Sequence, residues 1–201
     1  TTMFERHRQV FEALGFTLDL SNPIFPEKAV LSDEILKIIG NPNQKLIGIA
    51  PFAQYESKVY PLDLMQEVIS KIAANPEQTI LLFGGGKKET ELLDAFAKPF
   101  GNVINVAGKI KFTQELQLIS NLDVMLSMDS GNAHIAAMLG VKVITLWGAT
   151  HPYAGFSPFN QPIENALVAD RNLFPKLPTS VYGNKKVEGY EDAMRTISVD
   201  S

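Results

Sequence analysis

The sequence predicts an α/β fold, a doubly wound parallel sheet with helices on both faces. Its apolar runs are continuous rather than alternating, which is typical of strands buried on both sides. These runs alternate with stretches of helical periodicity five times along the chain. Short polar turns, several of them rich in glycine, follow the apolar runs. Ligands of such sheets bind beyond the carboxyl ends of the strands, so a site is expected among these turns.

Residues 1–44 are expected to form a lead-in helix and an interdomain connector. The first apolar residues recur at helical spacing as far as Leu14. Two prolines make residues 16–31 an extended stretch, and Ser32 is placed to cap a short helix after it. The Gly-Asn-Pro-Asn sequence at residues 40–43 then predicts a break in the chain.

The compact domain is expected to begin after this break, to occupy residues 45–201 and to alternate strands with helices. Apolar runs predict strands at residues 45–50, 79–83, 103–106, 123–128 and 142–147, with a short one near 166–169. Helical spacing predicts helices around residues 62–72, 92–96, 113–122 and 133–139, and it recurs over residues 190–197. Thr113 is expected to cap the third of these helices.

The composition is that of an ordinary globular chain and excludes several classes of protein. Of 201 residues, 45% are hydrophobic and 20% are charged. A net charge of -4 gives no electrostatic case for nucleic acid as a partner. The absence of cysteine excludes disulfides and thiolate metal sites, and it suits a reducing compartment. No apolar run reaches the roughly 18 residues of a membrane span, and the N-terminus has no signal-peptide pattern.

The most informative stretch is Asp129-Ser130-Gly131-x-x-His134. It follows an apolar run that predicts a buried strand, and it opens an apolar stretch, residues 133–139, that predicts a helix. The free N–H groups and the dipole of a helix N-terminus favour an anion such as phosphate. Asp129, in the same turn, would repel a bare anion. The combination indicates a ligand that carries both phosphate and hydroxyl groups.

Polar turns after the other strands are expected at the same edge of the sheet. These turns contain Gln54 and Lys58 after the first strand, Gly84 to Lys88 after the second, Gly108 to Ile110 after the third, and Gly148 to Pro152 after the fifth. Several of these residues also have simpler interpretations. The three glycines lack both phosphate-loop spacings and are compatible with a plain turn. Lys58 is compatible with a solvated loop lysine, His134 with a capped or core histidine, and Asp129 with a helix cap.

Two kinds of catalytic site find no support in the spacing of residues. Ser130 lies between a strand and a helix, as a nucleophile elbow does, but the first glycine of the elbow is missing. The spacing of residues does not support His151 as a base for Ser130, or Asp170 as the partner of His151. The three histidines do not show metal-ligand spacing, so a metal site is not expected.

The motif and its surroundings resemble a known family. Asp129-Ser130-Gly131-x-x-His134-x-Ala-Ala, followed by Val-Ile-Thr-Leu-Trp-Gly-Ala-Thr-x-Pro at residues 143–152, resembles the C-terminal half of the heptosyltransferases of glycosyltransferase family 9. The Ser-Lys-x-Tyr-Pro sequence at residues 57–61 resembles that family's Ser-Lys-x-Trp-Pro loop. Order and spacing match from about residue 45 to about residue 155.

The resemblance implies the C-terminal half of a two-domain glycosyltransferase of the GT-B type. In that family two Rossmann-like domains face each other across a cleft. The N-terminal domain binds the acceptor and carries the general base, and the C-terminal domain binds the nucleotide-sugar. This chain matches only the second, so it is expected to hold the donor site and to need an N-terminal acceptor domain as its partner.

The resemblance also implies roles for individual residues. Ser130 and Gly131 would offer hydrogen bonds to the donor diphosphate at the helix N-terminus. Lys58 would neutralise the charge that grows on the leaving group. Asp129 would accept hydrogen bonds from sugar hydroxyls, and His134 would lie beside the sugar or the phosphate.

The resemblance implies roles for three further residues whose match to the family's pattern is weaker. Gln54 stands where the family has a small hydroxyl residue near the phosphates. Ile110 would line the pocket for the base. The family often has an acidic residue after the second strand for the ribose hydroxyls, and here Glu89 is the candidate replacement.

The function implied is inverting, metal-independent transfer of heptose from an ADP-heptose donor to a lipid-linked saccharide of the lipopolysaccharide core. The nucleotide-sugar is a substrate, and no cofactor or nucleic acid is implied. The expected location is cytoplasmic, at the inner face of the inner membrane. Two alternatives remain open: a nucleotide-sugar epimerase of similar architecture, and a non-catalytic nucleotide-sugar-binding domain.

Overall fold

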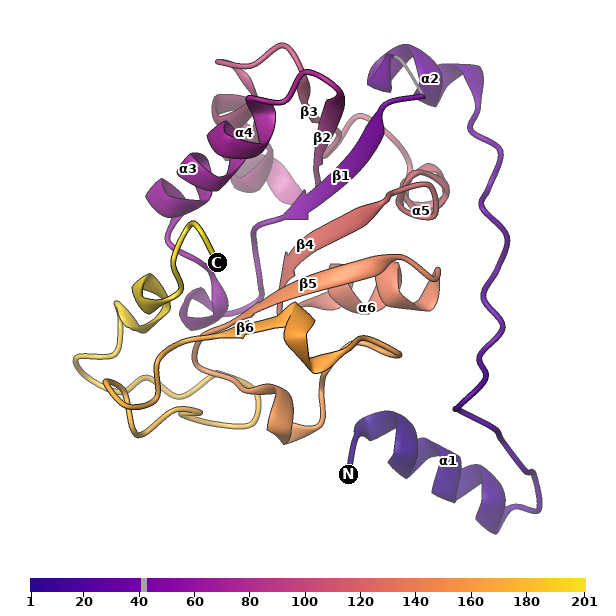
Figure 1. The fold of residues 1–201 in the computed structure, drawn as a ribbon, viewed down its shortest axis with the longest axis vertical. Helices are drawn as coiled ribbons and strands as arrows, with labels where there is room; N and C mark the ends of the chain where they lie inside the picture. Colours follow the sequence, from indigo (N-terminus) through magenta and orange to yellow (C-terminus); the bar gives the residue numbers. More distant parts are fainter. Residues whose placement is uncertain (41–42) are drawn as a thin grey trace.

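Six parallel strands form one sheet in the order β3-β2-β1-β4-β5-β6 (Figure 1). This computed structural model describes residues 1–40 and 43–201. The strands are β1 (Lys45–Ala50), β2 (Gln78–Leu82), β3 (Val103–Asn105), β4 (Val124–Met128), β5 (Lys142–Trp147) and β6 (Ala166–Val168). All five pairings are parallel, which confirms the predicted sheet.

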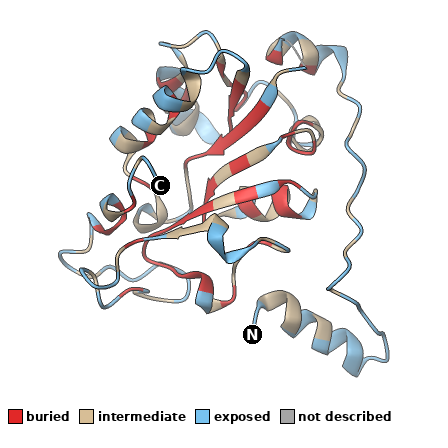
Figure 2. Ribbon diagram, viewed as in Figure 1, coloured by how far each residue is buried: buried red, intermediate tan, exposed pale blue. Residues whose placement is uncertain are grey.

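Helices cover both faces of the sheet. The helices of the described chain are α1 (Met3–Ala13), which lies outside the core, and α2 (Asp33–Ile39), α3 (Leu62–Ala73), α4 (Gly86–Ala97), α5 (Phe112–Ile119) and α6 (Gly131–Met138). There are also 3-10 turns η1 (Glu56–Lys58), η2 (Pro152–Ala154), η3 (Ile163–Asn165) and η4 (Ala193–Thr196). One core cluster joins α2, α5 and α6 to the sheet, and another joins α3, α4 and η4 to the opposite face. Buried residues accordingly run along the strands, as Figure 2 shows. The continuous apolar runs of the sequence follow from this two-sided burial.

The register of the central strands fixes which loops meet. Ala50 at the end of β1 lies opposite Ser127 in β4, and Met128 of β4 lies opposite Leu146 in β5. The segments that follow β1, β4 and β5 therefore leave the sheet side by side. β1 and β4 are also the point where the strand order changes direction, because β2 and β3 lie on one side and β5 and β6 on the other. Crevices at such points are where doubly wound sheets bind ligands.

The predicted helices exist, with corrections at their ends. Thr113 is not a cap: α5 starts at Phe112, and Lys111 is the residue before it. α5 also ends at Ile119 rather than at Leu122. The spacing seen over residues 190–197 yields only the short turn η4. Periodicity locates apolar residues well, but the ends of a helix depend on hydrogen bonds that it does not report.

The lead-in segment lies mostly outside the core. α1 buries none of its residues, and the chain after it runs extended along the outside of the domain (Figure 1). α2 differs, because Ile35 and Ile39 are 0% and 2% exposed within the core cluster. Ser32 accepts a hydrogen bond from Ile35 N–H and caps this helix as predicted. The predicted break includes residues 41–42, which lie outside the described residues, and the division at residue 45 stays a prediction.

Candidate functional site

Three loops at the carboxyl edge of the sheet bring together a small polar cluster. Lys58 Nζ lies 2.9 Å from Asp129 Oδ2, and the two side chains are only 13% and 9% exposed. Thr150 Oγ1 donates a hydrogen bond of 2.8 Å to the same Oδ2. Lys58 follows β1, Asp129 follows β4 and Thr150 follows β5, so the strand register itself assembles the cluster. Asp129 is therefore an ion-pair partner rather than a helix cap, and Lys58 is not a solvated loop lysine.

An irregular C-terminal segment holds Lys58 in place. Gly183 packs on the aliphatic stem of Lys58, and a Cβ atom at that position would lie 2.8 Å from Lys58 Cδ. Gly183 has φ +75°, a conformation that favours glycine for a second reason. Its carbonyl accepts a hydrogen bond of 2.6 Å from Ser57 Oγ. The segment thus restrains the loop that carries the cation.

The first turn of α6 follows Asp129 directly, and within residues 1–40 and 43–201 no side chain caps it. Ser130 is the N-cap residue, but its side chain makes no capping hydrogen bond. Its Oγ lies 3.0 Å from Ser127 Oγ instead. The exposed Gly131 follows as the first helical residue. The backbone N–H groups of this turn are thus available to an anion, and the helix dipole adds to their attraction.

His134 lies one turn further along α6 and is half-buried. Burial lowers the pKa of His134, because removal from water disfavours the charged imidazolium. Asp129 acts to raise this pKa and Lys58 to lower it. Both charges are thus close enough to act on the ring, and burial is the larger effect.

A shallow cavity of about 200 Å³ adjoins the N-terminus of α6. Its lining includes Gln54 from the loop after β1, Gly84 and Glu89 from the region after β2, and Asn132 of α6. Glu89 Oε2 accepts a hydrogen bond of 2.8 Å from Gly85 N–H. The loops after three neighbouring strands thus share one concave surface, as their order in the sheet requires.

Ile110 lies in the turn after β3. It is half-buried against the core cluster on the face of α5 and α6. The arrangement of His151 does not support a serine nucleophile, because His151 Nδ1 accepts a hydrogen bond from Tyr153 N–H and so does not donate to an acidic triad partner.

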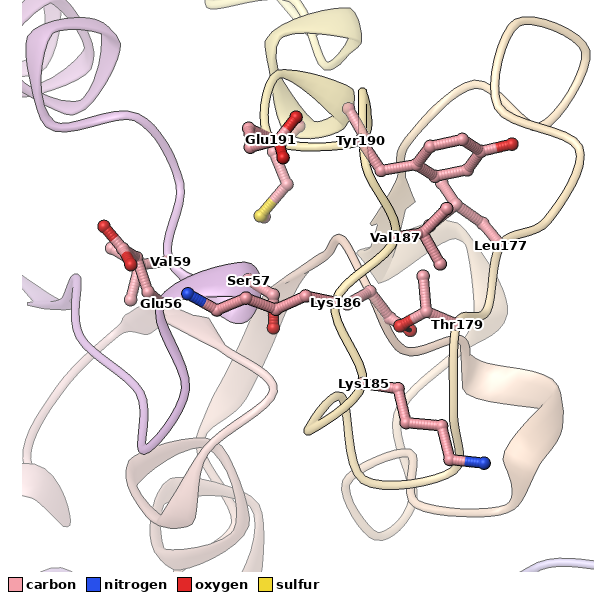
Figure 3. Close-up of a pocket in the computed structure, with 13 residues that line it drawn as sticks. Glu56, Ser57, Val59, Leu177, Thr179, Lys185, Lys186, Val187, Tyr190 and Glu191 are labelled. Carbon is pink, nitrogen blue, oxygen red and sulfur yellow. Dashed lines mark hydrogen bonds between the residues drawn. The ribbon is translucent and has the colours of Figure 1, made fainter.

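A second cavity, of about 210 Å³, is lined by residues on either side of Lys58 in the chain, Ser57 and Val59 among them. It is enclosed by the loop of residues 56–59 and by residues 177–194 (Figure 3). In Figure 3, Lys186 reaches across toward Glu56, whereas Lys185 points away. None of the residues predicted for the site lines this cavity.

Two residues that contact the Lys58–Asp129 pair were not predicted from the sequence as part of the site. Thr150 was visible only as one residue of a turn, and Gly183 lies in an irregular stretch without any recognisable motif. Both act through contacts with residues remote in the chain, which periodicity and spacing do not report.

Two other kinds of feature are absent from the described residues. Within residues 1–40 and 43–201, no three side chains of the types that bind metal ions converge on one point. In the same part of the chain, none of the helices combines the length and apolar character needed to span a bilayer.

Comparison with known proteins gives consistent matches. The family model for glycosyltransferase family 9 (heptosyltransferase) matches residues 1–185. Lipopolysaccharide heptosyltransferase 3 of Escherichia coli strain K12 is 26% identical over 184 residues, which are 89% of this chain and 52% of that protein. The chain spans about half the length of the curated relatives it matches, or less.

Solved structures give the same result for the fold. The ADP-heptose lps heptosyltransferase II of E. coli is similar over 99% of this chain and 59% of its own, with a TM-score of 0.65 and 21% identity. The E. coli heptosyltransferase WaaC with ADP is similar over 66% of this chain and 40% of its own, with a TM-score of 0.56 and 21% identity. At this level of identity the likeness shows a shared fold.

Proposed function

This chain belongs to glycosyltransferase family 9, the heptosyltransferases, and on that premise we propose that it is the donor-binding domain of an inverting, metal-independent glycosyltransferase. The proposed donor is ADP-heptose, and the proposed acceptor is a lipid-linked saccharide of the lipopolysaccharide core. Relatives named as heptosyltransferases support the reaction, and the ADP in one similar structure supports the nucleotide. The family match favours this reaction over the epimerase alternative.

One observation carries the assignment of the site. A shielded cation, an uncapped helix N-terminus and a carboxylate meet where the strand order changes direction. Lys58 and the N–H groups of Ser130 and Gly131 suit a diphosphate, because both supply positive potential to the same point. Asp129 suits sugar hydroxyls, which donate hydrogen bonds to a carboxylate.

The shallow cavity is our proposed site for the nucleoside. Glu89 would accept hydrogen bonds from ribose hydroxyls there, and Gln54 would contact the phosphates from the same surface. His134 would lie beside the sugar or the phosphate as a neutral ring, consistent with the direction of its pKa. Ile110 is proposed to border the base, from the loop after β3.

The proposed chemistry is a single displacement. An acceptor hydroxyl oxygen attacks the anomeric carbon of the donor sugar, and the bond from that carbon to the diphosphate oxygen breaks. Negative charge then grows on the departing nucleoside diphosphate. Lys58 would stabilise this charge, because a fixed cation in a site shielded from water is effective in that role. The proton of the acceptor hydroxyl goes to a base of the N-terminal acceptor domain.

Calorimetry with ADP tests the site directly. We expect the 201-residue chain to bind ADP and Lys58→Ala to weaken binding about tenfold or more, because charge-assisted hydrogen bonds contribute about 1.5–3 kcal/mol. Lys71→Ala is the matched control, since Lys71 is an exposed lysine paired with Asp200 at the surface. A chain that binds no nucleoside diphosphate would contradict the proposal, as would a Lys58→Ala variant with unchanged affinity.

Transfer itself requires the acceptor domain. With that domain restored, sugar should reach a lipopolysaccharide core acceptor only when donor and acceptor are both present. An altered nucleotide-sugar formed from donor alone would instead support the epimerase alternative. We place this reaction on the cytoplasmic side of the inner membrane, in accord with the family assignment.

A further inference from the structure

We propose that Asp129 and the donor diphosphate compete for Lys58, so that the site holds an intact nucleotide-sugar more readily than the spent nucleoside diphosphate. This inference rests on the proposed function. It concerns how the two halves of the donor are recognised together. It also gives Thr150 a role as a positioning residue.

The starting point is the ion pair itself. Lys58 Nζ and Asp129 Oδ2 lie 2.9 Å apart, with side chains 13% and 9% exposed. A diphosphate that takes this ammonium group must draw it away from Asp129, at least in part. The carboxylate then stays behind in a place with little water. Leaving one member of a shielded ion pair without its partner is costly.

An intact donor gives the Asp129 carboxylate a new partner, whereas a spent donor does not. The sugar hydroxyls of a nucleotide-sugar can donate hydrogen bonds to Asp129 as the diphosphate engages Lys58. Both charges then have partners again. A free nucleoside diphosphate engages Lys58 but brings nothing for Asp129. After transfer, the ion pair between Asp129 and Lys58 therefore forms again, and this favours release of the nucleoside diphosphate.

Thr150 keeps the carboxylate ready for this exchange. Its hydroxyl donates to Asp129 Oδ2 at 2.8 Å, the oxygen that also contacts Lys58. In the described part of the chain no hydrogen bond reaches Asp129 Oδ1. Oδ1 is thus the oxygen left for a sugar hydroxyl. Thr150 also gives Asp129 one remaining partner while Lys58 is engaged elsewhere.

Substitutions of Asp129 and of Thr150 should change the affinity for ADP in opposite directions. Asp129→Asn removes the competing charge while it preserves the shape of the side chain, so ADP should bind about tenfold more tightly than to the wild type. Thr150→Val removes the hydroxyl, so withdrawal of Lys58 leaves Asp129 without any partner and ADP should bind several-fold more weakly. Thr150→Ser keeps a hydroxyl and should restore the wild-type affinity.

The experiment is calorimetric titration of ADP and of ADP-heptose into the wild type and these variants. Asp200→Asn is the control, because it removes the same charge from an exposed pair with Lys71. Tighter ADP binding by Asp129→Asn, together with a smaller preference for ADP-heptose over ADP, supports the competition. The opposite shift with Thr150→Val supports the positioning role.

Other outcomes separate this inference from the proposed function. If the wild type binds ADP but Asp129→Asn binds it equally or less well, the competition is wrong and the donor site stands. If Thr150→Val and Thr150→Ser behave alike, the hydroxyl has no such role. If the wild type binds neither ADP nor ADP-heptose, both the proposed function and this inference fail.

Discussion

His134 shows how burial and two opposite charges act on one side chain. Burial lowers its pKa, Asp129 works against that change, and Lys58 works with it. The folded protein therefore favours the neutral ring more than the unfolded chain does. Because the unfolded chain takes up this proton first as the pH falls, stability associated with His134 is present above about pH 6.5 and is lost below it.

We expect the wild type to lose free energy of unfolding between about pH 7.5 and about pH 5, and His134→Gln to lose less over the same interval. Urea denaturation of both proteins at several pH values measures this difference. The pKa of His151 is also lowered by burial, but His151 is present in both proteins and cancels in the comparison. Parallel pH profiles for the two proteins would show that His134 is not the group responsible.

At the scale of elements, the two helices that precede the sheet, α1 and α2, differ in how far they are buried in the core. α1 contacts the domain through Phe4, whose ring centroid lies 5.0 Å from that of Phe159, and it buries none of its residues. α2 contributes two fully buried isoleucines to the core shared with α5 and α6. α2 thus packs in the core of the sheet, although it lies before the predicted boundary at residue 45.

Ile35→Ala should therefore lower the free energy of unfolding by about 2–5 kcal/mol, since it leaves a cavity in a close-packed core. Val10→Ala is the matched change on α1, where the side chain is 58% exposed. That variant should differ from the wild type by no more than about 0.5 kcal/mol. Equal effects in urea denaturation would mean that α2 does not belong to the core.

At the scale of the whole molecule, the lead-in segment is attached at a few points. Met3 N–H donates to the Gly155 carbonyl at 2.9 Å, and Ala29 N–H donates to Ser120 Oγ at 3.1 Å. The sheet and its two helical layers form without any buried residue from α1. The donor cluster depends on the sheet loops and on the segment around Gly183, all distant from α1 in the chain.

Removal of residues 1–15 should consequently leave both the thermal midpoint and the ADP affinity of the chain close to their original values. Circular dichroism melting and calorimetry measure the two quantities. Removal of residues 1–40, which also deletes α2, should lower the melting midpoint clearly and serves as the contrast. A shorter chain that loses its fold when α1 alone is absent would contradict this view of the segment.

Much of the architecture was predictable because it depends on local patterns. Continuous apolar runs such as residues 45–50 identified buried parallel strands, since both faces of each strand are covered. Ser32 was recognisable as a cap from its place before an amphipathic stretch. The end of α5 was missed because Leu122 continues the apolar pattern beyond Ile119, where the helix stops.

The sequence by itself determined the strands, most of the helices, the helix N-terminus at Ser130 and the family. Only the tertiary structure decided that Lys58 and Asp129 neutralise each other, that Thr150 shares their oxygen and that Gly183 packs on the lysine. The physical reason is the range of the interactions. Secondary structure follows from residues a few positions apart, whereas this cluster exists because the strand order sets β4 between β1 and β5.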